Sequence, residues 1–445
     1  MLRKCVIIVA LCLITVQSVR FGFGGTEQDW GYVTVRPGAH MFWWLYYTQA
    51  NVKNYTDRPL VIWLQGGPGA SSTGYGNFEE FGPLDLDLEE RNFTWVKDVN
   101  VLFIDNPVGS GYSYVDNLKL LTTNNEQIAR DLIALIKDFY KELPEFKKTP
   151  LHIYSESYGG KMAVEFAYLL DKAIKNNEIE CDLKSVGLVD SWISPIDSVL
   201  SWAEFLLNMG FVDTKGFTAI QASAIKTQHA LIKGEFVQST ILWGQTENVI
   251  VRETHAIDFY NVMYPQTYRK YLRTKNLFRA NIENAMFRTA VTRNDDDRDD
   301  RLNSLMNGKV KVVLEIPEHV KWGGQSNSVF STMYGDFMKP VTNVVELLLN
   351  NTNIEVAVIT GQLDLIVATP GTIKWVENLN WAGRAGYLKA PRDPIAPFGI
   401  LEGYQKSYSN LYVYWANRAG HMVPFDNPVA MDHILQKHTK YNEMN

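Results

Sequence analysis

The fold is decided by residues 151–160, which read Leu-His-Ile-Tyr-Ser-Glu-Ser-Tyr-Gly-Gly. The apolar run Leu151–Tyr154 predicts a short buried strand. Apolar residues then recur at helical spacing through Gly160–Ile174, so a helix begins within a few residues of the strand's end. Ser157 stands at the sharp turn between them, with a small residue two positions before it and another two positions after it. Such a strand–turn–helix exposes the serine hydroxyl and makes Ser157 a candidate nucleophile.

Strands and helices alternate along most of the chain on both sides of this turn. We expect buried strands at Leu60–Leu64, Val99–Ile104, Ser185–Val189, Ile354–Thr360 and Leu411–Trp415, a β-hairpin at Gly31–Tyr47, and a helix that begins at Thr123 with Glu126 as its capping-box partner. Because strands that alternate with helices form crossover units, the pattern predicts an α/β fold with a mostly parallel central sheet.

The pattern changes between about residues 193 and 336, where apolar helical stretches dominate and strand signals become scarce. We therefore predict an inserted, mainly helical cap at 193–336, between two parts of the α/β core at 21–192 and 337–445. Within the cap, residues 294–301 read Asn-Asp-Asp-Asp-Arg-Asp-Asp-Arg. We expect this run to form a solvated loop that is accessible to proteolytic cleavage.

The N-terminus has the features of a secretory signal peptide. Arg3 and Lys4 precede the apolar run Val6–Val16, which is shorter than the roughly 20 residues that a membrane anchor needs. We predict that residues 1–20 are removed and that the mature protein is secreted or lysosomal. Three glycosylation sequons fit this route, and they begin at Asn54, Asn92 and Asn350.

Composition excludes several classes of function. The 445 residues are 46% apolar, enough for a large core, and the net charge of −6 comes without a clustered basic excess, so no nucleic-acid partner is indicated. No later segment suits a membrane span. No His, Cys and carboxylate cluster has ligand spacing, so we expect neither a metal nor an organic cofactor. Cys181 is the one cysteine outside the signal peptide, which excludes an intrachain disulfide, and we interpret it as a packing residue. A monomer and a homodimer both remain open.

A serine hydroxyl needs a base to take its proton, and His421 is the candidate. It differs from most of the eight histidines because it follows a predicted strand after a short loop, at the edge where α/β sheets build their sites. Three aspartates that follow strands could hold its imidazole: Asp105, Asp190 and Asp364. Asp105 precedes the serine, against the usual chain order. We prefer Asp364 to Asp190 because it follows the cap and comes directly before the strand that delivers His421.

The tetrahedral intermediate of acyl transfer needs two N–H donors for its oxyanion. The residue after the nucleophile, Tyr158, supplies one backbone N–H. A Gly-rich loop, Gly-Gly-Pro-Gly at residues 66–69, follows a buried strand upstream of Ser157 and is the candidate for the second.

Taken together, these residues resemble the serine carboxypeptidase family, and most closely its retinoid-inducible members. The resemblance rests on four motifs in family order: Trp-Leu-Gln-Gly-Gly-Pro-Gly-Ala-Ser-Ser at 63–72, Phe-Ile-Asp-Asn-Pro-Val-Gly-Ser-Gly-Tyr-Ser at 103–113, Glu-Ser-Tyr-Gly at 156–159 and Gly-His-Met-Val-Pro at 420–424. It covers nearly the whole predicted mature chain apart from the cap. It implies an α/β-hydrolase that removes residues from the C-termini of peptides or proteins, usually at acidic pH.

The resemblance also implies a site. Its triad would be Ser157, Asp364 and His421, and its oxyanion donors the backbone N–H groups of Gly67 and Tyr158. The residues that match the family's grip on the substrate's terminal carboxylate are Trp63, Gln65, Gly66, Glu80 and Glu156.

Physical chemistry explains how carboxyl groups can bind a carboxylate. Two close carboxyls cannot both ionise cheaply, so one retains a proton, and a protonated Glu156 can donate a hydrogen bond to the substrate. We therefore expect an acidic optimum for peptide cleavage.

Two features depart from the family. Most members have Asn where this chain has Gln65, which puts the exopeptidase substrate range in question, and the disulfides that commonly tie the cap to the core are absent. Two other functions stay open. The same triad could catalyse acyl transfer to an alcohol, and a non-catalytic relative could act as a binding or stabilising partner.

Overall fold

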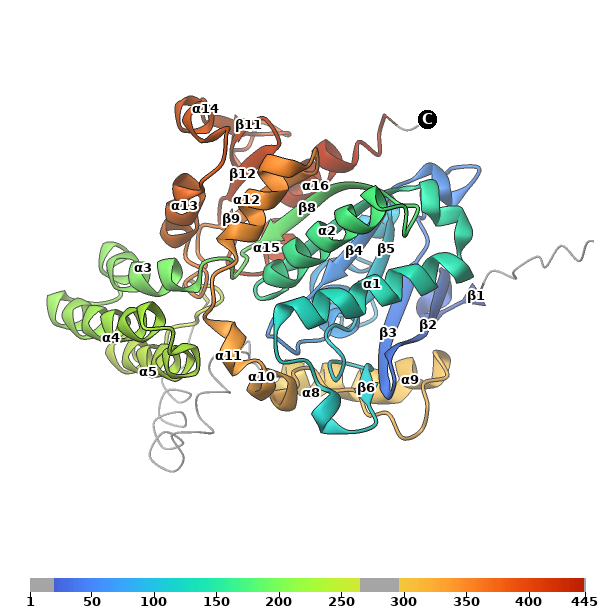
Figure 1. Cartoon of the computed structure of the whole chain (residues 1–445), viewed down its shortest axis with the longest axis horizontal. Coiled ribbons are helices and arrows are strands. Elements are labelled where there is room, and N and C mark those ends of the chain that lie inside the picture. Colours follow the sequence, from blue (N-terminus) through green and yellow to red (C-terminus); the bar gives the residue numbers. More distant parts are fainter. Residues whose placement is uncertain (1–19, 265–295, 444–445) are drawn as a thin grey trace, which may run out of the picture.

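The apolar runs expected as strands pair with one another in a single sheet. The computed structural model describes residues 20–264 and 296–443, and in these residues the sheet has twelve strands in the order β1-β2-β3-β5-β4-β7-β8-β9-β12-β11-β10, with β6 beside β3 (Figure 1). Neighbouring strands from β5 to β12 along this order run parallel, whereas the strands at both edges run antiparallel. The predicted α/β fold with a mostly parallel central sheet is confirmed.

The strands are β1 (Arg20–Phe21), β2 (Glu27–Arg36), β3 (Ala39–Tyr46), β4 (Leu60–Leu64), β5 (Asn100–Ile104), β6 (Tyr114–Val115), β7 (Pro150–Glu156), β8 (Asp182–Val189), β9 (Glu355–Gly361), β10 (Asp393–Ile395), β11 (Gly403–Tyr408) and β12 (Leu411–Ala416). The helices are α1 (Asn125–Glu142), α2 (Gly159–Lys175), α3 (Pro195–Asn208), α4 (Thr214–Ile232), α5 (Phe236–Thr254), α8 (Asp296–Leu305), α9 (Lys311–Val313), α10 (Asn327–Thr332), α11 (Tyr334–Phe337), α12 (Thr342–Asn351), α13 (Thr369–Asn378), α14 (Arg384–Lys389), α15 (Val423–Asp426) and α16 (Pro428–Thr439). A π-helical segment, Ser72–Phe81, follows β4.

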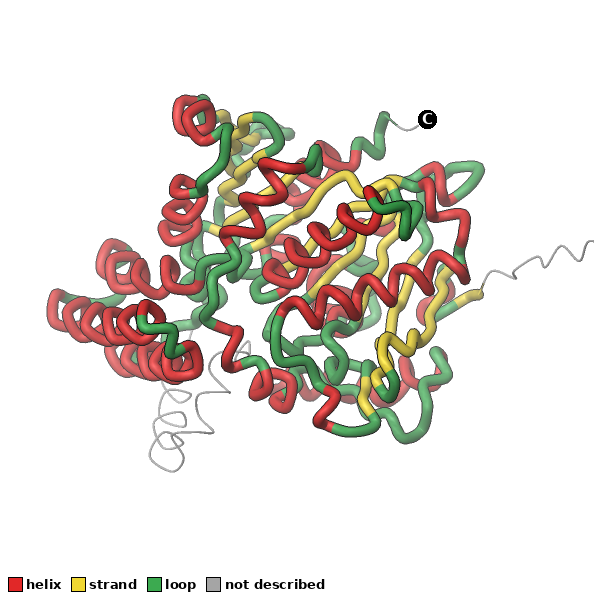
Figure 2. The backbone as a smooth tube through the Cα atoms, viewed as in Figure 1, coloured by secondary structure: helices red, strands yellow, loops and turns green. Residues whose placement is uncertain are grey.

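Helices cover both faces of the sheet because the central strands are apolar on both sides (Figure 2). Successive strand residues alternate between two cores: Ile62 and Ile153 belong to the core beneath α1, α2 and α12, whereas Val61 and Tyr154 belong to the core that includes α16 and the π-helical segment. Since parallel strands end at one edge of the sheet, the residues that follow β4, β7, β8, β9 and β12 all meet there.

The predicted cap contains helices α3 to α5 and α8 to α11, and its described residues, 193–264 and 296–336, include no strand of the sheet. In Figure 1, α3, α4 and α5 form a group at one side of the core, and α8 and α9 lie along another side. Two isolated β-bridges, at Gly323 and Gln325, join this region to the core. The cap boundaries themselves stay a prediction.

Residues 296–301 of the charged run are not the loop that we expected, and residues 294 and 295 lie outside the described residues. The described part of the run forms the first turns of α8, because Leu302 is buried beneath it and its arginines are paired. Arg298 lies 3.2 Å from the buried carboxylate of Glu79, and Arg301 pairs with Asp87. An ordered, paired helix is a poorer substrate for proteolysis than a loop, so residues 296–301 are less accessible than we expected, and cleavage within the cap stays a prediction.

Two further expectations need comment. Helix α1 is capped by Asn124, whose side chain accepts a hydrogen bond from the Gln127 N–H at 3.0 Å, and not by the predicted capping box of Thr123 and Glu126. The signal peptide at 1–20 lies outside the described residues except for Arg20. No helix within the described residues combines the length and the apolar character needed to cross a bilayer.

Candidate active site

Ser157 lies at the junction of β7 and α2 in a strained backbone conformation. Its φ is 59°, in the left-handed region that residues with a side chain rarely adopt. The turn is held on both sides, because the Ser157 N–H donates to the Val189 carbonyl at 3.1 Å and the Ser157 carbonyl accepts from the Gly160 N–H at 3.0 Å. Strain of this kind persists where the surroundings enforce it, and it points the serine hydroxyl out of the sheet edge.

Close backbone approach at this turn requires glycine at two positions. A Cβ on Gly66 would lie 2.5 Å from the Ser157 Cβ, and a Cβ on Gly159 would lie 2.3 Å from the Leu64 carbonyl oxygen. Ser155 occupies the place where this turn usually has its first glycine. Its hydroxyl is buried and donates to the Gly187 carbonyl at 3.1 Å, so serine is accommodated there.

His421 and Asp364 are joined by a short hydrogen bond. The Nδ1 of His421 lies 2.7 Å from the Oδ2 of Asp364, and both side chains are buried. The other oxygen of Asp364 accepts the Val367 N–H at 3.1 Å, and the His421 N–H donates to the Tyr260 carbonyl at 2.6 Å. Burial raises the pKa of Asp364, and the hydrogen bond from Val367 opposes that rise.

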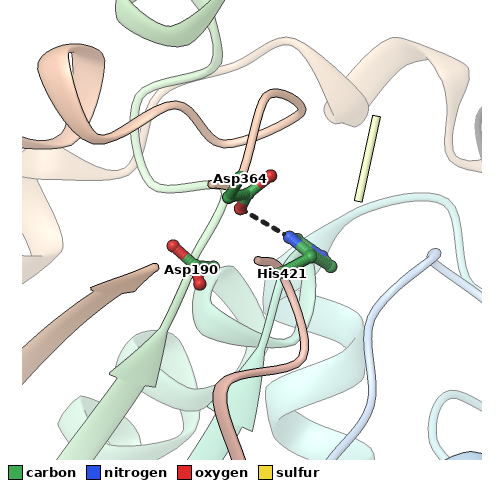
Figure 3. A group of neighbouring side chains, drawn as sticks. All are labelled: Asp190, Asp364 and His421. Atoms are coloured by element: carbon green, nitrogen blue, oxygen red, sulfur yellow. Dashed lines mark hydrogen bonds and ion pairs between the residues drawn. The ribbon is translucent and has the colours of Figure 1, made fainter. Parts of the chain in front are cut away.

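Asp190, the alternative partner for His421, is the third member of the group in Figure 3. Its two carboxylate oxygens accept the Gly361 N–H at 2.9 and 3.0 Å, whereas the dashed line from His421 runs to Asp364. Burial and then the charge of Asp364 raise the pKa of Asp190 well above its usual range. The structure therefore brings both candidate acids to the imidazole and gives the direct hydrogen bond to Asp364.

The same three residues are the group that could hold a cation. One ligand atom from each of Asp190, Asp364 and His421 lies within 4.8 Å of the others, a spacing that no other group of His, Cys, Asp or Glu in the described residues is found to have. The hydrogen bonds just described already engage these carboxylates.

Asp105, the third candidate aspartate, binds the backbone and side chains of neighbouring loops. Its carboxylate accepts the Ser71 hydroxyl at 2.7 Å, the N–H and hydroxyl of Thr73 at 3.1 and 2.8 Å, and the Tyr112 N–H at 2.8 Å. These bonds fix the start of the π-helical segment, so Asp105 is interpreted as structural.

A pocket opens above Ser157. It is lined by Gln65, Gly66, Gly67, Ala70, Tyr75, Glu79, Glu156, Ser157, Tyr260, His421 and Met422. The Gly-rich loop that forms one wall is tied to the cap, because the Gln325 amide donates to the Pro68 carbonyl at 2.8 Å and the Ser326 N–H donates to the Gly69 carbonyl at 2.9 Å. The two candidate oxyanion donors, Gly67 and Tyr158, thus flank the serine on a loop and a helix start that are both anchored.

Four of the predicted carboxylate-binding residues form one buried hydrogen-bonded network. The Gln65 amide accepts from the Trp63 indole at 2.7 Å and donates to Glu80 at 3.1 Å and to Glu156 at 2.9 Å. The longer glutamine side chain therefore still reaches both carboxyls. The fifth residue, Gly66, lines the pocket beside them.

This network is electrostatically coupled to the catalytic side of the pocket. Burial, then the charge of Glu80 and a hydrogen bond with it, raise the pKa of Glu156 well above its usual range. Glu156 Oε1 lies 4.0 Å from the His421 Nε2. A carboxyl of raised pKa that lines the pocket retains its proton in mildly acidic solution, which makes it a hydrogen-bond donor there.

Comparison with known proteins shows the family of this chain. The family model described as serine carboxypeptidase matches residues 21–441. The chain belongs to the serine carboxypeptidase family. It is 43% identical over 406 residues to the retinoid-inducible serine carboxypeptidase of Mus musculus, covering 90% of this chain and 88% of that protein. It is 38% identical to the serine carboxypeptidase-like 51 protein of Arabidopsis thaliana, covering 98% of each.

The fold agrees with a solved structure of the same class. Kex1Δp, a prohormone-processing carboxypeptidase from Saccharomyces cerevisiae, superposes with a TM-score of 0.77 at 21% identity, over 93% of this chain and 91% of that one. The family predicted from the four motifs is confirmed, and with it the class of serine-type peptidase, which acts on peptides.

One buried polar cluster close to Ser157 was not predicted from the sequence of this carboxypeptidase family member. The Tyr158 hydroxyl donates to the Asp336 carboxylate at 2.7 Å, and the same carboxylate lies 3.0 Å from the Lys161 ammonium, which is fully buried. The Lys161 ammonium also lies 4.8 Å from the centre of the Tyr158 ring, and the Phe337 ring stacks parallel to that of Tyr158 with centroids 5.9 Å apart. The signal that could have revealed it is a lysine, Lys161, among the small and apolar residues of the first turn of α2.

Removing Lys161 is expected to destabilise the protein by about 3–5 kcal/mol, because it leaves Asp336 buried without its cation. Burial lowers the pKa of Lys161 to about 8, and the pairing with Asp336 opposes that shift. The measurement is urea unfolding of Lys161→Met followed by tryptophan fluorescence. The matched control is Lys175→Met, which breaks the exposed pair with Asp171 and is expected to cost less than about 0.5 kcal/mol. Equal losses in the two variants would show that the buried cluster is unimportant.

Proposed function

We propose that this protein hydrolyses the C-terminal residue from peptides through a covalent acyl-enzyme. The observation that carries the proposal is the position of Ser157 between two networks in one pocket, the His421–Asp364 pair and the buried Gln65–Glu80–Glu156 network. A nucleophile beside a carboxylate-binding group selects the last peptide bond of a chain, because only that bond has a free carboxylate one residue away.

The geometry supports the following steps. The Ser157 hydroxyl attacks the carbonyl carbon of the last peptide bond and gives its proton to Nε2 of His421, whose Nδ1 is held by Asp364. The backbone N–H groups of Gly67 and Tyr158 stabilise the oxyanion. His421 then protonates the leaving amine, the C–N bond breaks, and the C-terminal residue departs. Water, deprotonated by His421, cleaves the resulting ester and restores Ser157.

The substrate's C-terminal carboxylate accepts hydrogen bonds from protonated carboxyl groups and from N–H groups. We assign this role to Trp63, Gln65, Gly66, Glu80 and Glu156. The two carboxyls share a proton at acidic pH, and Glu156 donates it toward the substrate. The raised pKa of Glu156 supports this assignment, because a pair of ionised carboxylates would repel the ligand.

Peptide hydrolysis is expected to be fastest at acidic pH. Glu156 must be protonated to bind the carboxylate, so binding is present below its raised pKa and is lost as the pH rises through that pKa, by about tenfold per pH unit. Glu156→Gln keeps a donor at every pH, so its kcat/KM is expected to depend much less on pH between 5 and 8. The measurement is kcat/KM against pH for both proteins. Identical profiles for the two would contradict the assignment.

The proposed activity is tested with pairs of substrates. A peptide with a free C-terminus and the same peptide as a C-terminal amide are incubated at pH 5, and products are identified by mass spectrometry. We expect stepwise loss of C-terminal residues from the free acid and slow or no cleavage of the amide. Cleavage inside the chain, or equal cleavage of acid and amide, would refute exopeptidase action.

We also propose that the chain enters the secretory pathway and is secreted or lysosomal. The three sequon asparagines, Asn54, Asn92 and Asn350, are all exposed, which supports glycan attachment there. Cys181 is half-buried, and burial raises the pKa of its thiol to about 12, which supports its interpretation as a packing residue.

A further inference from the structure

The pocket above Ser157 is lined by two acidic residues, Glu79 and Glu156. Glu156 belongs to the proposed carboxylate-binding network, whereas Glu79 has a cation as its partner. The Glu79 carboxylate lies 3.2 Å from the Nε of Arg298, and its side chain is 2% exposed. A guanidinium beside a buried carboxylate stabilises the ionised form of that carboxylate. The catalytic steps above use Glu156 and give the charge of Glu79 no role.

The negative member of this pair is the one nearer to the substrate. Among the described residues that line the pocket, Glu79 is present and Arg298 is not. The Arg298 side chain is 25% exposed, and its guanidinium carbon lies 5.3 Å from the centre of the Phe425 ring in α15. Coulomb energy falls with distance, and water screens an exposed charge more than a buried one. A group in the pocket is therefore affected more by the carboxylate than by the guanidinium.

Glu79 is adjacent to the groups that we assign to the substrate's C-terminal carboxylate. It precedes Glu80 in the π-helical segment, and the Glu80 carboxyl accepts the Gln65 amide at 3.1 Å. The Cα atoms of Glu79 and Glu80 are therefore about 3.8 Å apart. In a peptide, the C-terminal carboxylate and the side chain of the last residue share one Cα. Glu79 is thus placed beside the side chain of the residue that is released.

The surroundings of Glu79 suit a long basic side chain. Ala70, Tyr75 and Met422 line the same pocket and are mainly apolar. The Tyr75 hydroxyl lies 3.5 Å from the Asp299 carboxylate, which adds a second negative group on this side. Lysine and arginine have an apolar stem and a cationic end, so apolar walls can cover the stem while a carboxylate binds the charge. The same carboxylate repels an acidic side chain.

We propose that Glu79 recognises a lysine or arginine as the released C-terminal residue, with Arg298 as the partner that holds the carboxylate in its ionised form. This inference rests on the proposed function. It makes the protein a carboxypeptidase that releases basic residues faster than neutral residues of the same shape.

The test uses N-blocked dipeptides at pH 5 with wild type and the isosteric variant Glu79→Gln. The first pair, Leu-Lys and Leu-norleucine, removes the ammonium of the released residue and keeps its stem. The second pair, Lys-Leu and norleucine-Leu, makes the same change in the acyl residue. We expect wild type to prefer Leu-Lys by about tenfold or more in kcat/KM, and Glu79→Gln to lose most of this preference. The ratio within the second pair should not change.

The matched control is Glu90→Gln, which removes the charge of an exposed carboxylate outside the pocket. Labelling of Ser157 by a fluorophosphonate, equal in wild type and Glu79→Gln, establishes that the variant is folded with an intact nucleophile. In such a variant, an unchanged first ratio would overturn the inference, and so would a change confined to the second pair.

Wild type alone decides the matter if Glu79→Gln is not labelled. A first ratio near one in wild type would overturn the inference, whereas a first ratio of about ten or more with a second ratio near one would support it. Release of norleucine and lysine at equal rates would leave the proposed function intact and refute the basic preference. If wild type released no C-terminal residue from any of the four dipeptides, the proposed function itself would fail, and the inference with it.

Discussion

Replacing Ser157 by alanine is expected to lower kcat for peptide hydrolysis by about 10⁶-fold, the largest effect of any single change in this protein. Alanine removes the nucleophile, so the acyl-enzyme cannot form, while the oxyanion donors and the carboxylate network stay in place. Residual catalysis from those groups alone is about 10³-fold over water. Serine and alanine both have a Cβ, so the positive φ at position 157 strains them to a similar degree. The fold is therefore expected to change little.

The measurement is kcat with a C-terminally free peptide, together with active-site labelling by a fluorophosphonate. Wild type should be labelled at Ser157, and Ser157→Ala should not be labelled. Ser201→Ala is the control, since that hydroxyl donates to the Ser198 carbonyl within α3, away from the pocket above Ser157. Absence of labelling in wild type at pH 5 would favour the non-catalytic binding protein, and labelling without peptide cleavage would favour acyl transfer to another acceptor.

Asp364→Asn is expected to lower kcat by about 10⁴-fold, whereas Asp190→Asn should cost less than about tenfold. The Oδ2 of Asp364 holds His421 Nδ1 at 2.7 Å, and an asparagine amide there would present the wrong group to the imidazole and fail to stabilise the imidazolium. Asp190 instead accepts the Gly361 N–H, which an asparagine oxygen can also do.

The measurement is kcat of peptide hydrolysis at pH 5 for Asp364→Asn and Asp190→Asn. Both proteins should be folded, with thermal unfolding as the control for stability. A loss of about 10⁴-fold in Asp190→Asn with a mild effect in Asp364→Asn would reverse the assignment and make Asp190 the partner of the imidazole.

Much of the fold and the chain positions of the candidate site follow from local sequence. The strand and helix around Ser157 are encoded by the apolar spacing of 151–174, and the tight turn by the small residues beside it. The same holds for the Gly-rich loop, where Gly66 is the residue type that the contact with Ser157 allows. These features depend on steric contacts and periodicity within a few residues, so they can be predicted from local sequence.

Charge runs and caps were predicted less well. The charged residues at 294–301 predicted a solvated loop, yet residues 296–301 form a helix in which Arg298 pairs with Glu79 and Arg301 with Asp87. Those partners lie more than two hundred residues away in the chain. No local sequence pattern indicates these partners.

The sequence by itself therefore determined where Ser157 stands, the chain order of its candidate acid and base, and the family to which the chain belongs. The tertiary structure alone decided which aspartate touches His421, because Asp190 and Asp364 reach the same imidazole from neighbouring strands β8 and β9. It also decided that the Gln65 amide joins two carboxyls, that Lys161 pairs with Asp336, and that Glu247 is buried without a hydrogen-bond partner among the described residues. The physical reason is common to all four. The energy of a charge or a polar group depends on the burial and the partners that the crossovers of the chain bring to it from distant positions.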